Sequence, residues 1–572
     1  MYPDVRETIR GLLEKALCEQ VAIEDVAESD KADYASTIAF RLAAKQGRSP
    51  LPIAQDIASK ITPSGIVKKV EAAGGYVNFF IDYSIITAPL LEDVRNRGAS
   101  YGRAKSKGVK VVLEHTSINP SGPLHIGRLR NCLIGDCLAR VLRFTGYEVE
   151  THYFVNDVGK QIAIIAQGFR EGVAPDSEAL RNYSSYARKE DFKVFFEYVA
   201  ANRRFEEDPG FAARVQELIQ KAESGDAAAL SDITDVAKRC LSGQKEIYDF
   251  LDVRFDVFDY ESAYIRNGAV SQVLKFLRES SYAKDTDKGF GLDLTDYGLA
   301  RRDSVTILSR PDGTSVYLSR DIAYHLEKAK LGDVLINVLG EDHKFEFQEL
   351  ETILTKIYGI GKSMEAVHYS FVNFEGVELS TRKGQTAPVD KLLDEAVKKA
   401  GEEIEARGIA SKNAAPVIAI GAVKYHILKT SPHKTITFRW QDALSFEGDA
   451  APYIQYAHAR CCSIVEKSGI NPAAIDVRGI DVGRLEKEEE SLIRMFTRFP
   501  DLVERTAEER RPNLLANYLY ELAAAYSRFY KECPVLSADE AVKNRRLMLV
   551  DAARQVLANG LLLLGIESPK KM

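Results

Sequence analysis

The sequence has 572 residues, of which 45% are hydrophobic and 28% charged, and its formal net charge is -6. A chain of this length predicts about three or four domains, and the composition excludes a disordered chain. No apolar run approaches the roughly 18 to 20 residues of a membrane span, and the amino terminus lacks the apolar block of a signal peptide, so we expect a cytoplasmic protein.

The seven cysteines are scattered along the chain, and none is spaced as CxxC. This pattern argues against a disulfide framework and against a cysteine zinc site. We therefore expect reduced thiols and no structural metal held by the protein. The net charge neither indicates nor excludes a nucleic-acid partner, because such binding depends on local basic surface.

The first 95 residues predict a mixed α+β unit. Residues 33–61 keep helical spacing, and GGYVNFFID (74–82) alternates like a strand. Residues 95–110 then contain six Lys or Arg and no acid. We expect 96–108 to be a solvated linker, and contact with a polyanion is the alternative.

A strand, a helix and a second strand are predicted after this linker. VKVVLEHTS (109–117) is apolar and β-branched at its start, which is typical of a buried strand, and EVETHYFV (148–155) predicts another. Between them, apolar residues recur every three or four positions on one face of a helix that ends at Gly146. That face consists of Ile126, Leu129, Leu133, Cys137, Val141 and Phe144. The unit is βαβ and implies a parallel, doubly wound sheet.

The rest of the chain divides into three parts. Residues 170–245 are polar and helical and look like an insertion. The alternation of strands and helices resumes in DVLINVLG (333–340), FEFQELETILTKIYG (345–359) and EAVHYSFVNFEG (365–376). From about residue 391 to 572 nearly everything has helical periodicity, which predicts a helical bundle.

The turn before the first of these helices carries residues suited to phosphate. A helix that starts at the carboxyl end of a parallel strand favours anions, and ligands bind at that edge of the sheet. Gly127 removes a side chain where a ligand must approach the backbone, while His125 and Arg128 can both donate to the same phosphates. The alternative is that His125 caps a local turn and Arg128 is only solvated.

Several motifs carry a resemblance to a known family. PSGPLHIG (120–127) resembles the HIGH signature of class I aminoacyl-tRNA synthetases, and STRKG (380–384) resembles a variant of their second signature. Within that class the chain is most similar to the arginyl-tRNA synthetase family along essentially its whole length. The segments that carry this likeness are VNDVGKQ (155–161), YLSRDIAY (317–324), GDAAPYIQYAHARCCSI (448–464) and the closing VLANGLLLLGIESPKKM.

The resemblance implies a fold and a function. It implies a class I Rossmann-like catalytic domain (109–390), an α+β N-terminal domain (1–95) that contacts the tRNA elbow, and an all-α anticodon-binding domain (391–572). The activity would be that of an ATP-dependent arginine–tRNA ligase, with L-arginine, ATP and tRNA(Arg) as partners. Magnesium would arrive with ATP. We expect a monomer.

Arginine makes a chemical demand on its pocket. Its guanidinium is a planar fork of donors that is never neutral, so it needs a carboxylate of matching geometry. Asp321 lies four residues after Tyr317, which places both on one face if the segment is helical. Glu261 is either a second acid of this pocket or a surface carboxylate. By resemblance, the residues that bind the amino acid are Glu114, Ser117, Asn119, Glu261, Tyr317, Asp321 and Glu341.

The resemblance also assigns the other sites. It implies that ATP is bound by Pro120, His125, Gly127, Arg128, Ser380 and Lys383. The catalytic residues would be His125, Gly127, Arg128, Arg382 and Lys383, which stabilise charge on the phosphates. For tRNA the candidates are Tyr453, Tyr456 and His458, and packing inside the helical bundle is the alternative for all three.

The two signatures depart from the family pattern. Arg128 stands where the family has a second histidine, and Arg is a permanent cation without an acid–base role. Glu378 and Thr381 replace the two lysines of the second signature, which leaves Arg382 and Lys383 as its cations. Family members that lack the second-signature lysine often carry one before HIGH, but Gly122 stands there.

Other functions compete with this one. A class I synthetase for cysteine would need zinc-binding cysteines, and one for an acidic amino acid would need a basic pocket in place of Asp321. A non-catalytic tRNA-binding paralogue would keep the fold and lose the chemistry. A small nucleotidyltransferase leaves both ends of the chain unexplained.

Overall fold

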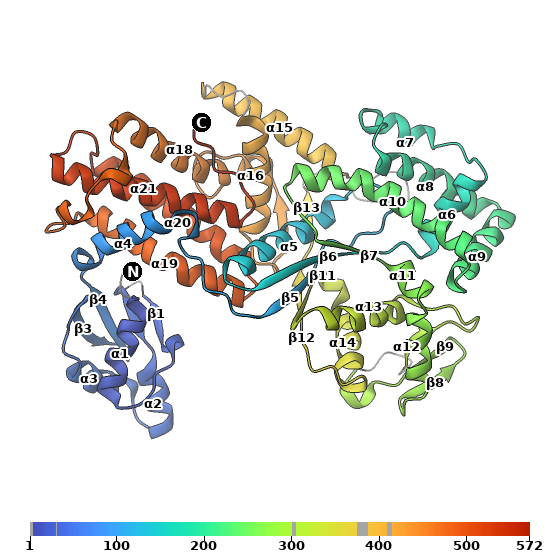
Figure 1. Ribbon diagram of the computed structural model, residues 1–572, viewed down its shortest axis with the longest axis horizontal. Coiled ribbons are helices and arrows are strands. Elements are labelled where there is room, and N and C mark those ends of the chain that lie inside the picture. Colours follow the sequence, from blue (N-terminus) through green and yellow to red (C-terminus); the bar gives the residue numbers. More distant parts are fainter. Residues whose placement is uncertain (1–3, 30, 300–304, 375–386, 409–413) are drawn as a thin grey trace.

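A computed structural model gives the structure of residues 4–29, 31–299, 305–374, 387–408 and 414–572 (Figure 1). Ser380, Arg382 and Lys383 of the expected second signature lie outside the described residues.

The N-terminal unit is an antiparallel sheet of four strands, in the order β1-β2-β4-β3, with helices packed against it, at the lower left of Figure 1. Its elements confirm the predicted α+β unit. They are α1 (Val5–Leu17), β1 (Val26–Glu28), β2 (Tyr34–Ser36), α2 (Ile38–Gln46), α3 (Pro50–Lys60), β3 (Val67–Ala73) and β4 (Tyr76–Ile81), followed by α4 (Tyr83–Arg97).

The segment after this unit is not the solvated linker that we expected. Helix α4 runs through the expected boundary at residue 95, and Tyr101 is fully buried. The Tyr101 hydroxyl donates to the Phe496 carbonyl over 2.8 Å, and its ring stacks on Phe499. A side chain at Gly102 would meet the same Phe499 ring. The prediction was wrong because the apolar partners of this basic segment lie about 400 residues further along the chain.

The central sheet has five parallel strands in the order β12-β11-β5-β6-β7. Its strands are β5 (Lys110–Glu114), β6 (Glu148–Val155), β7 (Val257–Tyr260), β11 (Val334–Gly340) and β12 (Ser363–Tyr369). Helix α5 (Ile126–Phe144) joins β5 to β6 and ends two residues before Gly146. The predicted βαβ unit and parallel sheet are therefore confirmed.

Strand β5 separates two environments because its side chains alternate between the faces of the sheet. Val111 and Leu113 share a core with α5, whereas Val112 packs with Ala329 of α13 (Tyr317–Leu331). Glu114 continues the second series. Helix α5 thus covers one face and α13 the other.

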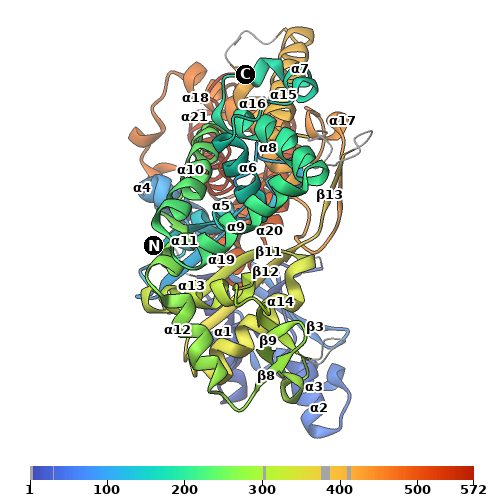
Figure 2. The same ribbon diagram turned by 90° about the vertical axis from the view of Figure 1, so that its right-hand side faces the viewer.

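A helical lobe and a smaller subdomain lie on either side of the strands, the lobe above and α12 to α14 below in Figures 1 and 2. The lobe confirms the predicted helical insertion. It consists of α6 (Lys160–Arg170), α7 (Ser177–Asn182), α8 (Glu190–Glu207), α9 (Pro209–Glu223) and α10 (Ala227–Phe250). The subdomain contains α11 (Glu261–Arg266), α12 (Ala269–Arg278), the antiparallel strands β8 (Ala283–Thr286), β9 (Gly289–Leu292) and β10 (Thr306–Ser309), and α14 (Lys344–Thr352).

The C-terminal part is a helical bundle, as predicted, with one exception. A short strand, β14 (Ile436–Phe438), pairs in parallel with β13 (Val372–Phe374). The helices are α15 (Val389–Ala406), α16 (Ala414–Leu428), α17 (Trp440–Ala443), α18 (Ala451–Ser468), α19 (Lys487–Glu508), α20 (Pro512–Glu532) and α21 (Glu540–Leu563). Helices α16 and α19 pack on α5, which ties the bundle to the sheet. None of the helices within the described ranges is both long and apolar enough to cross a membrane.

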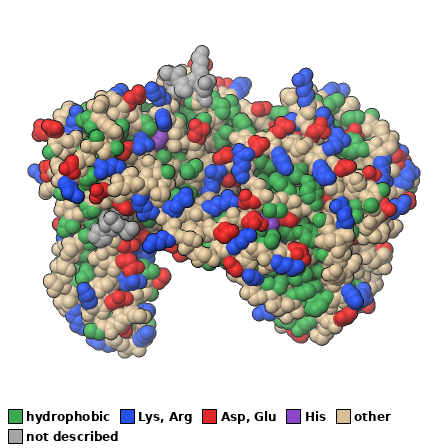
Figure 3. Space-filling model, in the orientation of Figure 1, with side chains coloured by type: hydrophobic (Ala, Val, Ile, Leu, Met, Phe, Trp, Pro, Cys, Tyr) green, Lys and Arg blue, Asp and Glu red, His purple; other side chains and the backbone are tan. Residues whose placement is uncertain are grey.

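One face of the molecule is shown in space-filling form in Figure 3. Lys and Arg side chains are interspersed with Asp and Glu across it. A deep notch on the lower edge separates the N-terminal unit from the domain that contains the central sheet.

Candidate active site

The chain makes a strained turn directly after β5. Thr116 and Ser117 have φ values of 71° and 40°, a left-handed conformation that non-glycine residues rarely adopt. The Thr116 N–H donates to Asn131 Oδ1 over 2.7 Å. Ser117 Oγ accepts from the Phe154 N–H over 3.1 Å and donates to Glu114 Oε1 over 3.1 Å. These bonds fix Ser117 at the carboxyl edge of the sheet, where the sequence expects the ends of the amino acid.

His125 is the N-cap of α5. Its Nδ1 accepts the Gly127 N–H over 3.0 Å, so a neutral ring carries its proton on Nε2. Burial and the nearby Arg128 lower the pKa of His125, which favours this neutral form. A Cβ at Gly127 would lie 3.1 Å from Nδ1. Gly127 therefore makes room for the cap, and the helix keeps one free histidine donor.

Arg128 and the residues before the signature line the same turn. Arg128 is exposed, and its Nη1 lies 3.4 Å from the Tyr369 hydroxyl at the end of β12. Pro120 is buried, whereas Asn119 is exposed and donates to Gln161 over 3.2 Å. Arg128 is thus free to meet an anion from solvent.

A second arginine of α5 supports the neighbouring strands. Arg130 is fully buried and donates to the carbonyls of Ser370 (2.6 Å), Ser431 (2.9 Å) and Lys434 (2.8 Å). Burial lowers the pKa of Arg130 to about 10, and the charges of Tyr369 and Glu341 only partly oppose this shift. The three carbonyls flank β13 and β14, and β13 ends just before residue 375. Arg130 therefore ties together the backbone just before β13 and just before β14.

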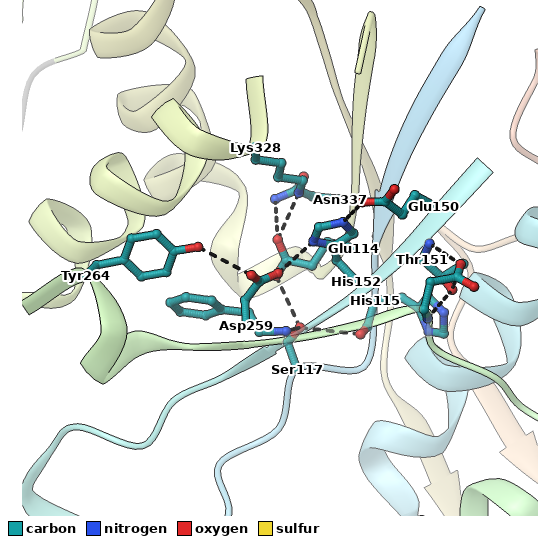
Figure 4. A network of polar contacts seen from close by, with 12 residues as sticks. Glu114, His115, Ser117, Glu150, Thr151, His152, Asp259, Tyr264, Lys328 and Asn337 are labelled. Atoms are coloured by element: carbon teal, nitrogen blue, oxygen red, sulfur yellow. Dashed lines mark hydrogen bonds and ion pairs between the residues drawn. The ribbon is translucent and has the colours of Figure 1, made fainter. Parts of the chain in front are cut away.

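On the other face of β5, Glu114 begins a buried polar network, drawn in Figure 4. Lys328 Nζ donates to Glu114 Oε2 over 2.9 Å and to Asn337 Oδ1 over 2.7 Å. Burial opposes a charged carboxyl, but Lys328 outweighs it, and the pKa of Glu114 lies below its usual value. With Ser117 on its other oxygen, Glu114 acts here as a support for the turn.

Beside this network, His152 of β6 lies between two carboxylates (Figure 4). Its Nδ1 is 2.6 Å from Asp259 Oδ2 and its Nε2 is 2.8 Å from Glu150 Oε1. Burial disfavours the charged ring, but these two hydrogen bonds outweigh it and raise the pKa of His152. Tyr264 donates to the other oxygen of Asp259 over 3.4 Å.

Tyr317 and Asp321 lie on the first turns of α13, so the helix that their spacing required is present. Both side chains reach solvent, with 56% of Tyr317 and 43% of the Asp321 side chain exposed. Among the described residues, no Lys or Arg lies within ion-pair distance of Asp321. Partial burial and the charges of Glu114 and Glu261 raise the pKa of Asp321 to about 8. The nearby His325 is neutral, since burial lowers its pKa to about 4.

Glu261 contradicts one of the two sequence hypotheses. It is only 1% exposed, so the surface alternative is wrong. Its Oε1 accepts from Arg320 Nε over 2.5 Å, so this oxygen is engaged by a resident guanidinium. The partner was not foreseen because Arg320 lies 59 residues away in sequence. Glu341, the other acid expected near the substrate, is exposed directly after β11.

Sequence reasoning missed the residues that support these acids: Arg320, His325, Lys328 and Asn337. A signal for two of them was present. Asp321, His325 and Lys328 are spaced by four and three positions, which places them on one face of a helix.

The three tRNA candidates on α18 have different surroundings. His458 is 3% exposed and its Nδ1 lies 2.9 Å from the Pro569 carbonyl, so its assignment to a tRNA surface is corrected to a packing role. Tyr453 is half-buried and donates to Ser527 Oγ over 3.0 Å. Tyr456 is exposed, and the guanidinium of Arg460 lies 4.6 Å from its ring.

Metal ligands and substrates place different demands on such a site. Over the part of the chain that the structure describes, no three His, Cys, Asp or Glu side chains are grouped so that they could hold a metal ion. The site instead offers donors at the start of α5 and carboxylates at the start of α13.

Comparison with known families matches three consecutive models to the chain. "Arginyl tRNA synthetase N terminal domain" matches residues 3–81, "tRNA synthetases class I (R), catalytic domain" matches 90–440, and "DALR anticodon binding domain" matches 454–572.

Individual proteins agree with these matches. The chain is 40% identical to the arginine–tRNA ligase of Methanocaldococcus jannaschii, with 100% of this chain and 99% of the relative covered. It is also 40% identical to that of Methanothermobacter thermautotrophicus, with the same coverage. The solved structure of Thermus thermophilus arginyl-tRNA synthetase superposes with a TM-score of 0.82 at 28% identity, covering 99% of this chain and 100% of that one. The chain therefore belongs to the arginyl-tRNA synthetase family of class I synthetases.

Proposed function

We propose that this chain is an arginine–tRNA ligase. In the first step, a carboxylate oxygen of L-arginine attacks the α-phosphorus of ATP. The new O–P bond gives arginyl-adenylate, and the bond to pyrophosphate breaks. In the second step, the 2′-hydroxyl of the terminal adenosine of tRNA(Arg) attacks the arginyl carbonyl carbon, AMP leaves and the hydroxyl proton passes to solvent. The observation that carries the proposal is Asp321, a carboxylate without a cationic partner among the described residues.

The charges around α13 support arginine as the substrate. Lys328 pairs with Glu114, and Arg320 is shared between Glu261 and Glu223, so the local carboxylates outnumber these cations. A guanidinium at Asp321 reduces this excess. In this arrangement Tyr317 packs beside the guanidinium, while Ser117, Asn119 and Glu341 lie toward the ammonium and carboxylate ends of the substrate.

The start of α5 supports ATP binding. The positive end of the helix dipole, the His125 Nε2 donor and the exposed Arg128 suit the phosphates. Ser380, Arg382 and Lys383 stabilise the leaving pyrophosphate by resemblance to the second signature. Mg²⁺ accompanies ATP and is held mostly by phosphate oxygens and water, and the steps assigned to this chain's residues do not run through it.

For tRNA, the N-terminal unit and the C-terminal bundle are the proposed contacts. The exposed Tyr456 is the one of the three α18 candidates whose ring is open to solvent. The match of residues 454–572 to an anticodon-binding family supports this side of the proposal.

The test is pyrophosphate exchange with arginine, lysine, glutamate and cysteine, each with and without tRNA(Arg), followed by aminoacylation. We expect exchange with arginine alone among these amino acids. The matched control is Asp321→Asn, which keeps the size of the side chain and removes its charge. Exchange with a different amino acid would favour another class I synthetase. Tight tRNA binding without any exchange would favour the non-catalytic paralogue.

A further inference from the structure

The helical lobe has a core of its own. Apolar residues of α6, α8, α9 and α10 form one cluster that is separate from the core of the central sheet. From α9 this cluster includes Phe211, Val215, Leu218 and Ala222. Helix α10 also contributes Ala237, Leu241, Ile247 and Tyr248 to the core of the central sheet, so apolar packing joins the lobe to the sheet through α10. The end of α9 adds polar contacts to this joint.

Glu223, the last residue of α9, makes such a contact at the amino-acid site. Only 8% of its side chain is exposed. Its Oε2 accepts the Ser315 N–H over 2.8 Å and the Ser315 hydroxyl over 2.6 Å. Its Oε1 accepts from Arg320 Nη1 over 3.1 Å. Both oxygens thus bind residues that flank Tyr317, more than 90 positions away in sequence.

Arg320 connects Glu223 to the residues that are proposed to bind arginine. Its guanidinium lies 5.0 Å from the Tyr317 ring centre, and its Nη1 also donates to Ser315 Oγ over 2.9 Å. The opposite side of the guanidinium is fixed by Glu261. Arg320 directly precedes Asp321 on α13. A change in the position of Glu223 therefore moves the residues next to both proposed guanidinium contacts.

The lobe also comes near this place through Thr234 of α10, which bonds Ser262, and through Gly159, where a Cβ would lie 3.4 Å from the Tyr317 hydroxyl. The ion pairs of Glu171 and Lys189 lie elsewhere. Glu171 accepts from Arg214 over 2.7 Å and pairs with Arg204, both on the lobe itself. Lys189 pairs with Asp390 of α15. These ion pairs do not involve the start of α13. Glu223, in contrast, connects the lobe to the loop before α13 and to the first turn of α13, which carry Tyr317 and Asp321.

We propose that Glu223 is a positioning residue of the arginine site, through which the helical lobe sets Tyr317 and Asp321. Arginine binding and the placement of the lobe are then coupled, and the coupling is reciprocal. This inference rests on the proposed function, because it takes arginine as the ligand of Asp321.

The first experiment compares Glu223→Gln with wild type in pyrophosphate exchange, and Glu171→Gln is the matched control. Loss of a buried charge-assisted contact predicts an arginine KM about tenfold or more higher. The KM for ATP should stay within about twofold, because the start of α5 does not touch Glu223. Glu171→Gln should match wild type in both constants. Glu223→Asp, which keeps the charge on a shorter stem, should recover part of the loss.

A second experiment measures the coupling directly. Hydrogen exchange of wild-type protein is followed with and without saturating arginine. Arginine should slow exchange in the last turn of α9, and Glu223→Gln should abolish that protection.

Three outcomes overturn the inference. Glu223→Gln could leave the arginine KM unchanged, it could raise the KM for arginine and ATP equally together with a lower melting temperature, or α9 could show no protection by arginine. The second outcome would make Glu223 a structural staple only. If wild type shows no arginine-dependent exchange at all, the proposed function falls and this inference falls with it. Normal wild-type activity with a silent Glu223→Gln variant removes the inference alone.

Discussion

The starts of α5 and α13 flank the same strand and carry opposite charge. At α5 lie a half-buried neutral histidine and an exposed arginine, and the buried Arg130 donates to carbonyls. At α13, carboxylates exceed their resident cations, and Asp321 is left without one among the described residues. The two sides of β5 therefore differ in charge. The side of α5 suits phosphates, and the side of α13 suits a cationic side chain.

The largest effect is expected from removing the charge of Asp321 on α13. Asp321→Asn should lower kcat/KM for arginine by about 1000-fold, because the guanidinium then binds without its charge partner. The KM for ATP should change little. Steady-state pyrophosphate exchange measures both. Glu327→Gln, an exposed acid on the same helix paired with Lys330, is the matched control. A similar loss in both variants would mean that general charge on α13 matters and that a specific pair does not.

The next largest effect is expected from removing the His125 donor at the start of α5. His125→Ser keeps a side chain that can cap α5 but removes the Nε2 donor. Exchange should fall by about 100-fold, the scale of losing one charge stabiliser, while the melting temperature stays close to wild type. A loss of melting temperature in proportion to activity would assign His125 to the cap alone.

The raised pKa of Asp321 predicts a pH dependence of arginine binding. Below about pH 8 the free site holds Asp321 largely protonated, and arginine binds the anion, so each binding event releases a proton. The arginine KM should therefore fall roughly tenfold or more between pH 6.5 and 8.5. Glu114 and His325 do not interfere, since their pKa values are lowered and they stay anionic and neutral over this range. Glu261 also titrates in this range, because burial raises its pKa to about 7, so the Asp321→Asn variant is needed to assign the slope. The slope should vanish in Asp321→Asn, and a slope that survives there would place the titrating group elsewhere.

The smallest effect is expected at the residue that departs from the family pattern. Arg128→His should keep exchange activity within about tenfold, because either side chain donates to phosphate from an exposed position. Complete loss would show that the phosphate site has been rebuilt around the longer arginine.

The local periodicity of the sequence predicted most of the helices and strands, but it predicted fewer of the contacts in the candidate site. The strand before Glu114, helix α5 and the lobe follow from periodicities within a few residues of one another. Asp321 was found through a motif and confirmed on a helix. The partners of the acids were not predictable in the same way, because the pairs Arg320–Glu261 and Lys328–Glu114 join residues 59 and 214 positions apart.

The same limit applies to His458 and Tyr101. For His458 the sequence left tRNA contact and packing both open, and the chain returns 111 residues later to cover it. A sequence pattern describes the face of one helix, and it does not say which distant segment packs on that face.

Because Tyr101 is buried, the chain segment around it has little tolerance for added or deleted residues. The Asn559 side chain donates to the carbonyls of Gly98 and Tyr101, and Lys107 pairs with Glu504. An added or deleted residue between these anchors would shift the tyrosine off Phe499. By composition this segment resembles a loop that could accept a graft, a tag or proteolytic trimming. Its contacts instead require one length, because they connect the first part of the chain to the last.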